Sequence, residues 1–504
     1  MRQILVALIL AVSVLPWSPL AASQAGSNSS DAELILAAES GDTKAVQQLL
    51  RKGAKSADSA LIVAASMGQT DVVKVLLREG AHIEATENGD TALVRAAMVG
   101  KADIVKLLLA KGANIEARNN SGETALIRAS VVGNADMVKL LLEEHADIEA
   151  EDNNGDTALI QAAMGGSADM VKLLLEKGAD IDAKNNGGDT ALLTAVNLGR
   201  AEIGKLLLDR GTKGGDTALL RAVVLRQTET VKLLVDMGVK GGDAALIEAA
   251  SMGETDVVKL LLEEGANIEA KDSNGNMALV QAASSGQTEV VKLLLEKGAN
   301  VEAKDNHGDM TLIEAASMGK TEVVKLLLEK HANIEAMNNR GDTALIGAAS
   351  GGRTEVVKLL LDRGANIEAR NIEGFTALLN AAILGKADVV ELLLDSGANI
   401  EAKDTVEATA LLRAVSGLAP LSMGHPNVVK LLLDRGANIE AKNYEGNTAL
   451  LLAAFLGETD FVKLLLDRGA SVEAKNNHGD TALQLADSRG HPEVAKLLQE
   501  KGAH

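Results

Sequence analysis

The chain of 504 residues has no cysteine, and only 1% of its residues are aromatic. The absence of cysteine excludes disulfide bonds, thiolate nucleophiles and cysteine-ligated zinc sites, and it is compatible with an oxidising compartment. The shortage of aromatic rings leaves Ala, Leu, Ile and Val to form the interior, because apolar residues still make up 47% of the chain. Such small and aliphatic side chains suit a core built in successive thin layers.

An excess of positive charge is missing too, since 50 Lys and Arg residues face 70 Asp and Glu residues and the net charge is -20. Nucleic acids and anionic membranes are bound through basic surfaces. We therefore expect neither of them as a partner.

Part of the acidity recurs at one position of a repeated segment. We interpret these acids as a solvent-exposed row that alternates with Lys or Arg. An acidic rail for a cationic partner or for Ca²⁺ is the alternative, although no dense carboxylate loop of the EF-hand type occurs. The acids are Glu84, Glu116, Glu149, Asp182, Glu269, Glu302, Glu335, Glu368, Glu401, Glu440 and Glu473.

The apolar stretch at the N-terminus, 4–15, is shorter than the ~20 residues that a membrane-spanning helix needs. It follows Arg2 and ends at Pro16, and the later sequence Ser-Gln-Ala, which ends at Ala25, fits a cleavage site. These features predict a secretory signal peptide at 1–25 and a linker at 26–30. We therefore expect an exported protein, periplasmic or extracellular, without membrane insertion after cleavage.

The rest of the chain is one stretch repeated, mostly at intervals of 33 residues. In the cleanest copy, 342–374, Thr343 opens a short first helix and Gly352 turns the chain. An apolar stripe over 356–361 predicts a second helix, and 366–370 is expected to be an extended arm. The copies open at fifteen positions: Asp31, Asp58, Asp90, Glu123, Asp156, Asp189, Asp216, Asp243, Asn276, Asp309, Asp342, Phe375, Ala408, Asn447 and Asp480.

This pattern resembles the ankyrin repeat, a 33-residue unit of two antiparallel helices and a β-hairpin finger. The resemblance implies an all-α solenoid with short β-hairpin fingers, one elongated domain at 31–504 with capping repeats at 31–57 and 480–504. The usual family opening is Thr-Pro-Leu-His, whereas most copies here read Thr-Ala-Leu followed by Ile, Leu or Val. The histidine hydrogen bonds of the family are therefore absent, and apolar packing must replace them.

The ends of the expected helices carry suitable residues. Threonine is a good N-cap for the first helices, and glycine follows nearly every second helix, where a left-handed cap is needed. His145 and His331 replace that glycine in two copies, and Arg226 replaces a glycine between two helices. We expect all three to adopt the left-handed conformation. The threonines are Thr91, Thr124, Thr157, Thr343 and Thr448.

Two features interrupt the period. The copies from Asp189 and Asp216 are 27 residues long, because short Lys-Gly-Gly connections replace their arms. This finger gap, near 211–243, is either a weak point or a hinge. The copy from Ala408 has six extra residues around 418–423, which are either a tolerated loop or a partner contact.

Catalytic motifs are not recognisable in this sequence. The eight histidines are scattered, and neither His-Glu-x-x-His, nor Gly-x-Ser-x-Gly, nor a phosphate-binding loop occurs. We therefore expect no enzyme, no cofactor and no metal site. The predicted function is a monomeric, non-catalytic scaffold that binds a protein through a concave groove and the fingers. A secreted effector that engages a host protein and an envelope structural spacer remain alternatives.

Two sets of residues are candidates for partner binding. The fifth residue of each opening varies in polarity, so we expect a charged row along the groove, with plain solvation as the alternative. The second set consists of apolar residues beyond position 370 that do not fit the core pattern, with scattered surface residues as the alternative. The first set is Arg95, Arg128, Arg221, Glu248, Glu314 and Arg413, and the second is Ile372, Phe375, Val406, Tyr444 and Phe455.

Overall fold

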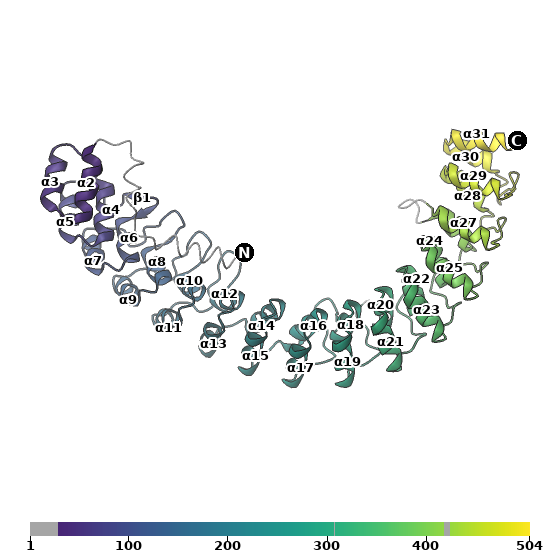
Figure 1. Ribbon diagram of the computed structural model, residues 1–504, viewed down its shortest axis with the longest axis horizontal. Helices are drawn as coiled ribbons and strands as arrows, with labels where there is room; N and C mark the ends of the chain where they lie inside the picture. The colour runs from purple at the N-terminus through teal and green to yellow at the C-terminus, as the bar shows by residue number, and fades with distance from the viewer. Residues whose placement is uncertain (1–28, 307, 418–423, 504) are drawn as a thin grey trace. The chain divides into compact units, whose positions relative to one another are not determined.

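The computed structural model describes residues 29–306, 308–417 and 424–503. The predicted signal peptide, the linker residues 26–28 and the inserted segment 418–423 lie outside these ranges. Ser29 and Ser30, which the sequence assigned to the linker, already belong to the first described helix. The described residues contain 30 helices, which follow one another in fifteen pairs (Figure 1). They divide into two compact units, one that ends at Val239 and one that begins at Lys240.

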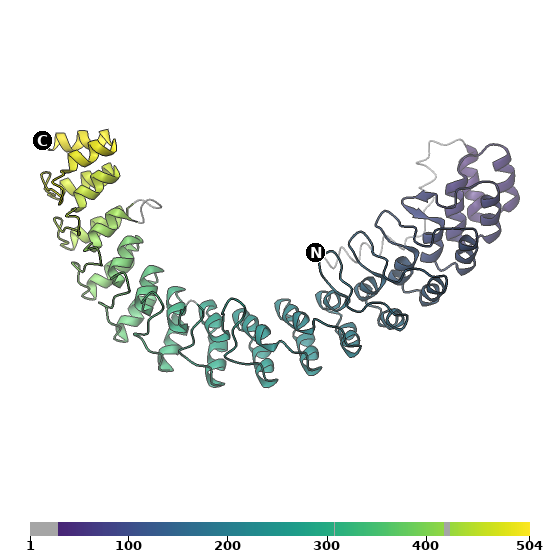
Figure 2. The ribbon, with the colours of Figure 1, turned by 180° about the vertical axis from the view of Figure 1, so that it is seen from behind.

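The N-terminal unit contains seven helix pairs and the one two-stranded sheet of the described chain. In Figure 2 its loops lie side by side along one edge of the helix stack. Its elements are α2 (Ser29–Ser40), α3 (Thr43–Arg51), α4 (Ala57–Met67), α5 (Thr70–Arg78), β1 (Thr86–Glu87), β2 (Asp90–Thr91), α6 (Ala92–Met98), α7 (Ala102–Ala110), α8 (Ala125–Val132), α9 (Ala135–Glu143), α10 (Ala158–Gly165), α11 (Ala168–Glu176), α12 (Ala191–Asn197), α13 (Ala201–Asp209), α14 (Gly215–Val224) and α15 (Thr228–Asp236).

The C-terminal unit contains eight helix pairs. Its helices are α16 (Gly242–Met252), α17 (Thr255–Glu263), α18 (Ala278–Ser285), α19 (Thr288–Glu296), α20 (Thr311–Ser317), α21 (Thr321–Glu329), α22 (Ala344–Ser350), α23 (Thr354–Asp362), α24 (Ala377–Ile383), α25 (Ala387–Asp395), α26 (Ala410–Ser416), α27 (Pro426–Asp434), α28 (Ala449–Leu456), α29 (Thr459–Asp467), α30 (Ala482–Arg489) and α31 (Pro492–Glu500).

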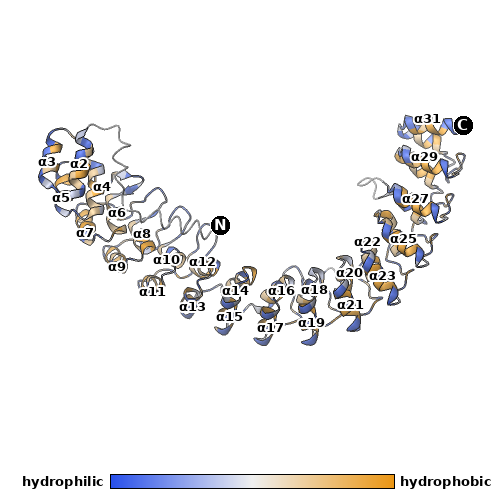
Figure 3. Cartoon of the chain, viewed as in Figure 1, coloured by the Kyte–Doolittle hydropathy of each residue, from blue (hydrophilic) through white to orange (hydrophobic). Residues whose placement is uncertain are grey.

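The core lies between neighbouring repeats. Within each unit, first helices pack on first helices and second helices on second helices. Val356, Val357 and Leu360 of α23 are at most 1% exposed, as the stripe predicted. Ile127 and Ile346, which stand where the family usually has histidine, are also buried, so apolar packing does replace the histidine bonds. In Figure 3 the outer ends of second helices such as α17 and α19 are hydrophilic.

The predicted helix ends are confirmed. Each of the five threonines accepts a hydrogen bond from the backbone N–H three residues later, as Thr343 does from Ile346. His145, His331 and Arg226 have φ angles of 69°, 66° and 56°, the left-handed conformation expected for them.

The connections between repeats, which we call fingers, differ from the expected hairpins. The arm 366–370 is not extended, because Ala369 N–H donates to Asn366 O at 3.1 Å and closes a turn. Asn366 stabilises that turn by accepting from Glu368 N–H at 3.0 Å. Paired strands occur only in β1–β2, and three other described fingers make a single bridge each. Local side-chain hydrogen bonds of Asn and Asp here take precedence over strand pairing.

Candidate binding surface

The periodic acids hold the fingers together. Glu302 Oε1 accepts a hydrogen bond from Asn333 N–H of the next repeat at 2.7 Å, and Glu335 does the same for Asn366. The row is therefore an inter-repeat hydrogen-bond ladder on the surface, a role beyond the solvation that the sequence predicted. The acids that make this bond are Glu84, Glu116, Glu149, Asp182, Glu269, Glu302, Glu335, Glu368, Glu401 and Glu440.

A second ladder links the tips of the fingers. In the C-terminal unit, Ile372 N–H donates to Arg340 O of the preceding tip at 3.0 Å. Thr405 N–H and Tyr444 N–H continue the ladder, each to the tip before it, at 3.2 and 3.1 Å. The tips are therefore held in register by backbone bonds that do not depend on the side chains they display.

Three neighbouring tips display apolar side chains, and we call Ile372, Val406 and Tyr444 the fingertip strip. Ile372 is 70% exposed, Tyr444 is 58% exposed and Val406 is half-buried. Asn153, at the matching position of another finger, instead donates its side-chain amide to Asn120 O of the preceding tip at 2.9 Å. Ile372 lacks an amide that could make this bond. The strip therefore displays apolar surface in place of a stabilising contact.

Each tip of the strip also carries an exposed glutamate, namely Glu373, Glu407 and Glu445. Tyr444 Oη donates to Glu445 Oε1 at 2.9 Å. This hydrogen bond, together with the negative charge of Glu445, raises the pKa of Tyr444. Glu407 Oε2 lies 3.6 Å from the exposed Lys403 ammonium.

Glu407 stands where the other fingers around the strip have glycine, and its φ is 60°. A non-glycine residue in this conformation costs on the order of 1 kcal/mol. The chain thus holds a carboxylate on the central tip against a conformational penalty.

Phe375 is not exposed as predicted, because its residue is only 7% accessible. In most other repeats this position holds an acid, and Asp342 accepts from Asn371 of the next finger at 2.8 Å. The next finger here has Asp404 in place of that asparagine, which would repel an acid. A phenyl ring fits instead, and the Arg413 guanidinium covers it at 5.0 Å while pairing with Asp404 at 2.6 Å.

Phe455 does not belong to the strip either. It is half-buried at the C-terminal end of α28, and the Arg489 guanidinium lies 4.0 Å from the centre of its ring. The finger of Tyr444 precedes the other end of this helix, about 12 Å away for eight residues. The structure therefore brings together Ile372, Val406 and Tyr444 but not the two phenylalanines.

The arginines of the charged row predicted along the groove are largely paired with acids of the protein itself. Arg95 contacts Asp90 at 2.9 Å, and the Arg128 side chain is only 13% exposed beside Glu123. In each of these repeats, the arginine side chain is five residues after the acid that opens the repeat and reaches its carboxylate. Arg221, 43% exposed and 3.8 Å from Asp189, is the most accessible of the four arginines. The acids of the row, Glu248 and Glu314, are half-buried.

Sequence reasoning missed an apolar row in the N-terminal unit. Met67, Val99 and Val132 are 37, 42 and 47% exposed at the ends of three consecutive first helices. Their sequence signature is an apolar residue directly before the inter-helix glycine, beyond the core stripe.

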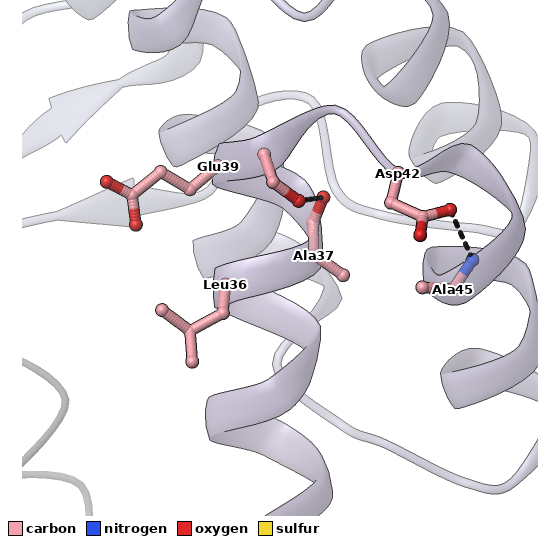
Figure 4. Close-up of a pocket in the computed structure, with 6 residues that line it drawn as sticks. Leu36, Ala37, Glu39, Asp42 and Ala45 are labelled. Atoms are coloured by element: carbon pink, nitrogen blue, oxygen red, sulfur yellow. Dashed lines mark hydrogen bonds between the residues drawn. The ribbon is translucent and has the colours of Figure 1, made fainter.

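A pocket lies between α2 and α3 at the start of the described chain (Figure 4). The side chain of Leu36 is 56% exposed there. Asp42 uses its carboxylate to cap α3 by accepting from Ala45 N–H at 2.9 Å, so its polar group already has a structural role. The pocket is lined by Leu36, Ala37, Glu39, Ser40, Asp42 and Ala45.

Within the described ranges, no cluster of three or more His, Asp or Glu side chains could hold a metal ion. None of the helices described is both long and apolar enough to cross a membrane.

The repeated helix pairs agree with the comparison to protein families. The model for ankyrin repeats (three copies) matches residues 34–119, 114–185, 182–242, 236–305, 312–404 and 411–504. The chain belongs to the ankyrin-repeat family. Ankyrin repeats are generally protein–protein interaction modules, and the family is typically non-catalytic. No curated protein matches the chain significantly.

Proposed function

We propose that this ankyrin-repeat protein is a non-catalytic scaffold whose protein partner docks on the fingertip strip. The observation that carries the proposal is the pair of highly exposed apolar side chains, Ile372 and Tyr444, on tips that the backbone ladder holds in register. Exposed apolar groups on rigid supports bind with little loss of conformational entropy. Tyrosine is also among the residues that dominate binding energy at interfaces.

The test uses the full chain as bait. A partner is captured from periplasmic extract or culture medium and purified, and its affinity is then measured by titration. Joint replacement Ile372→Ser with Tyr444→Ala should weaken that affinity by more than about 2 kcal/mol, roughly thirtyfold. The matched control, Asn153→Ser with Asn186→Ala, alters two tips of the N-terminal unit and should leave the affinity for the partner unchanged. Unaltered affinity in the strip variant would reject this surface, and capture of no discrete partner would favour a structural spacer.

We also propose that the protein acts outside the cytoplasm, on the basis of residues 1–25. Fractionation of cells with an antibody to the repeats tests this. Protein found in the periplasm or the medium, and shortened at its N-terminus by mass spectrometry, supports export. Full-length protein in the cytoplasm contradicts it.

A further inference from the structure

The fingertip strip combines apolar and acidic groups, and on the middle tip the pair stands one position later, because Val406 is equivalent to Glu373 and Glu407 to Gly374. Each of its three tips carries one apolar residue and one exposed glutamate: Ile372 with Glu373, Val406 with Glu407, and Tyr444 with Glu445. The fingers of the N-terminal unit do not share this pairing, because the tips at 120–121 and 153–154 carry only Asn and Ser. The combination is therefore a property of three consecutive repeats and not of the repeat pattern.

The Lys and Arg side chains of the same fingers donate hydrogen bonds to backbone carbonyls of the following finger. Arg370 donates to Lys403 O, and Lys442 donates to Lys475 O at 2.8 Å, each to the following finger. Lys403 likewise reaches Lys442 O at 3.3 Å. The tips consequently present carboxylates, while the head groups of the neighbouring cations have carbonyl partners, and Lys403 lies in addition 3.6 Å from Glu407.

The left-handed Glu407 adds an independent argument. Glycine would satisfy the backbone at this position without strain, as Gly374 does in the preceding finger with a φ of 77°. Local strain of this kind tends to persist where a side chain has a function. Here the side chain that is kept in spite of the strain is the Glu407 carboxylate, at the middle of the strip.

We infer that the fingertip strip binds a cationic, apolar segment of a protein in extended conformation, with an apolar residue at every third position and Lys or Arg beside it. This inference deepens the proposed function and assumes it. Neighbouring repeats are about 10 Å apart, the usual distance between packed helices. An extended chain in the polyproline II conformation has three residues per turn and advances about 9 Å in three residues, so every third side chain lies on the same face and the apolar groups meet one tip each.

The preceding tip limits the length of the segment. Arg340 is exposed on that tip and carries the opposite charge. A cationic segment should therefore end at Ile372 and continue only towards Tyr444.

Tyr444 is the one tyrosine of the chain, so 3-fluorotyrosine incorporation yields a single ¹⁹F resonance at the strip. The probes are synthetic peptides of about ten residues. One repeats Leu-Lys-Ser, a second repeats Leu-Glu-Ser, and a third has the same Leu and Lys content at helical heptad spacing. The first peptide should give a saturable shift that weakens with added salt, and the other two should bind at least tenfold more weakly.

Variants separate the role of the carboxylates from a structural role. Glu407→Gly should weaken binding of the Leu-Lys-Ser peptide by about threefold to fivefold, the scale of one exposed ion pair. The same variant should raise the thermal unfolding midpoint, because it removes the strained conformation. Asp388→Asn removes an equal charge from α25 of the same unit and should leave the affinity unchanged.

Several outcomes would overturn the inference: no shift with the Leu-Lys-Ser peptide, equal binding of the Leu-Glu-Ser peptide, or tighter binding of the heptad peptide. If a captured protein shifts the Tyr444 resonance while the Leu-Lys-Ser peptide does not, this partner chemistry is wrong and the proposed function stands. If the peptide binds and no protein is captured, the proposed function fails while the chemistry of the strip is supported.

Discussion

At the scale of single residues, a repeat makes the exceptions informative. Phe375 departs from the acid that most copies have at this position, and Asp404 and Arg413 accommodate the change together. Asp404 has a fully buried side chain that accepts backbone hydrogen bonds from Val406 and Ala408 as well as the Arg413 contact. Arg413 thus neutralises a buried charge, a role quite different from the groove contact that its position suggested.

This role predicts unequal effects within the arginine row. Arg413→Ala should destabilise the C-terminal unit by roughly 2–4 kcal/mol, because it leaves the Asp404 carboxylate buried without its cation. Arg221→Ala should change stability by less than about 0.5 kcal/mol, since Arg221 is 43% exposed and makes only a long ion pair. Urea unfolding followed by circular dichroism measures both.

A second replacement checks the cause. Adding Asp404→Asn to Arg413→Ala should restore part of the loss, because a neutral amide needs no cation. If Arg413→Ala and Arg221→Ala had the same free energy of unfolding, the ion pair of Arg413 would contribute no more to stability than the exposed pair of Arg221.

At the scale of elements, the fingers are stabilised by their neighbours more than by their own strands. Most described fingers lack paired strands, yet most arms donate one N–H to a carboxylate of the preceding repeat, and the arms at His82 and Asn267 donate to the opening acid of their own repeat. A hydrogen bond to a charged acceptor contributes more than a neutral one. The ladder therefore couples repeats along the chain, and the cost of losing one bond should be local.

Glu302→Ala removes one bond of this ladder. We expect a loss on the order of 1 kcal/mol, less than a buried charged pair because the bond is exposed. Deuterium exchange measured by mass spectrometry should accelerate in the peptide that contains Asn333. The control is Glu329→Ala, which removes an exposed glutamate from the end of α21 in the repeat that contains Asn333. It should leave the exchange rate at Asn333 unchanged. An identical exchange rate in both variants would contradict the coupling role of the ladder.

At the scale of the whole molecule, the sequence predicts the architecture because every repeat restates it. Helix pairs, threonine caps and the left-handed residues occupy positions that recur from copy to copy, so an element that is ambiguous in one copy can be assigned from the others. Phe375 could not be predicted in this way, since its burial depends on Arg413 in the next repeat, 38 residues later. The sequence named all three residues of the fingertip strip, together with two phenylalanines that lie elsewhere, but the ladder that brings the tips into register is a backbone property.

The finger gap is where nearest-neighbour coupling should be weakest. The last bond of the acid ladder in the N-terminal unit joins Asp182 to Lys213 N–H, and the two shortened repeats that follow have no arm acid of their own. The first helix of the second shortened repeat, α14, also begins after Gly214 without a side-chain cap, whereas Thr190 caps α12 of the first. The boundary between the two compact units, after Val239, falls in the same region.

In a solenoid whose stability is a sum of repeat and interface terms, local opening concentrates at the weakest interface. Amide hydrogen exchange among internal repeats should therefore be fastest between Thr190 and Gly241. Insertion of a complete finger, copied from 366–374, into the connection at 212–214 should slow it, whereas an equally long Gly-Ser insertion should not, because only the finger supplies an acceptor for the next repeat. Uniform protection across the internal repeats, or equal effects of the two insertions, would show that the missing fingers do not determine where this molecule opens.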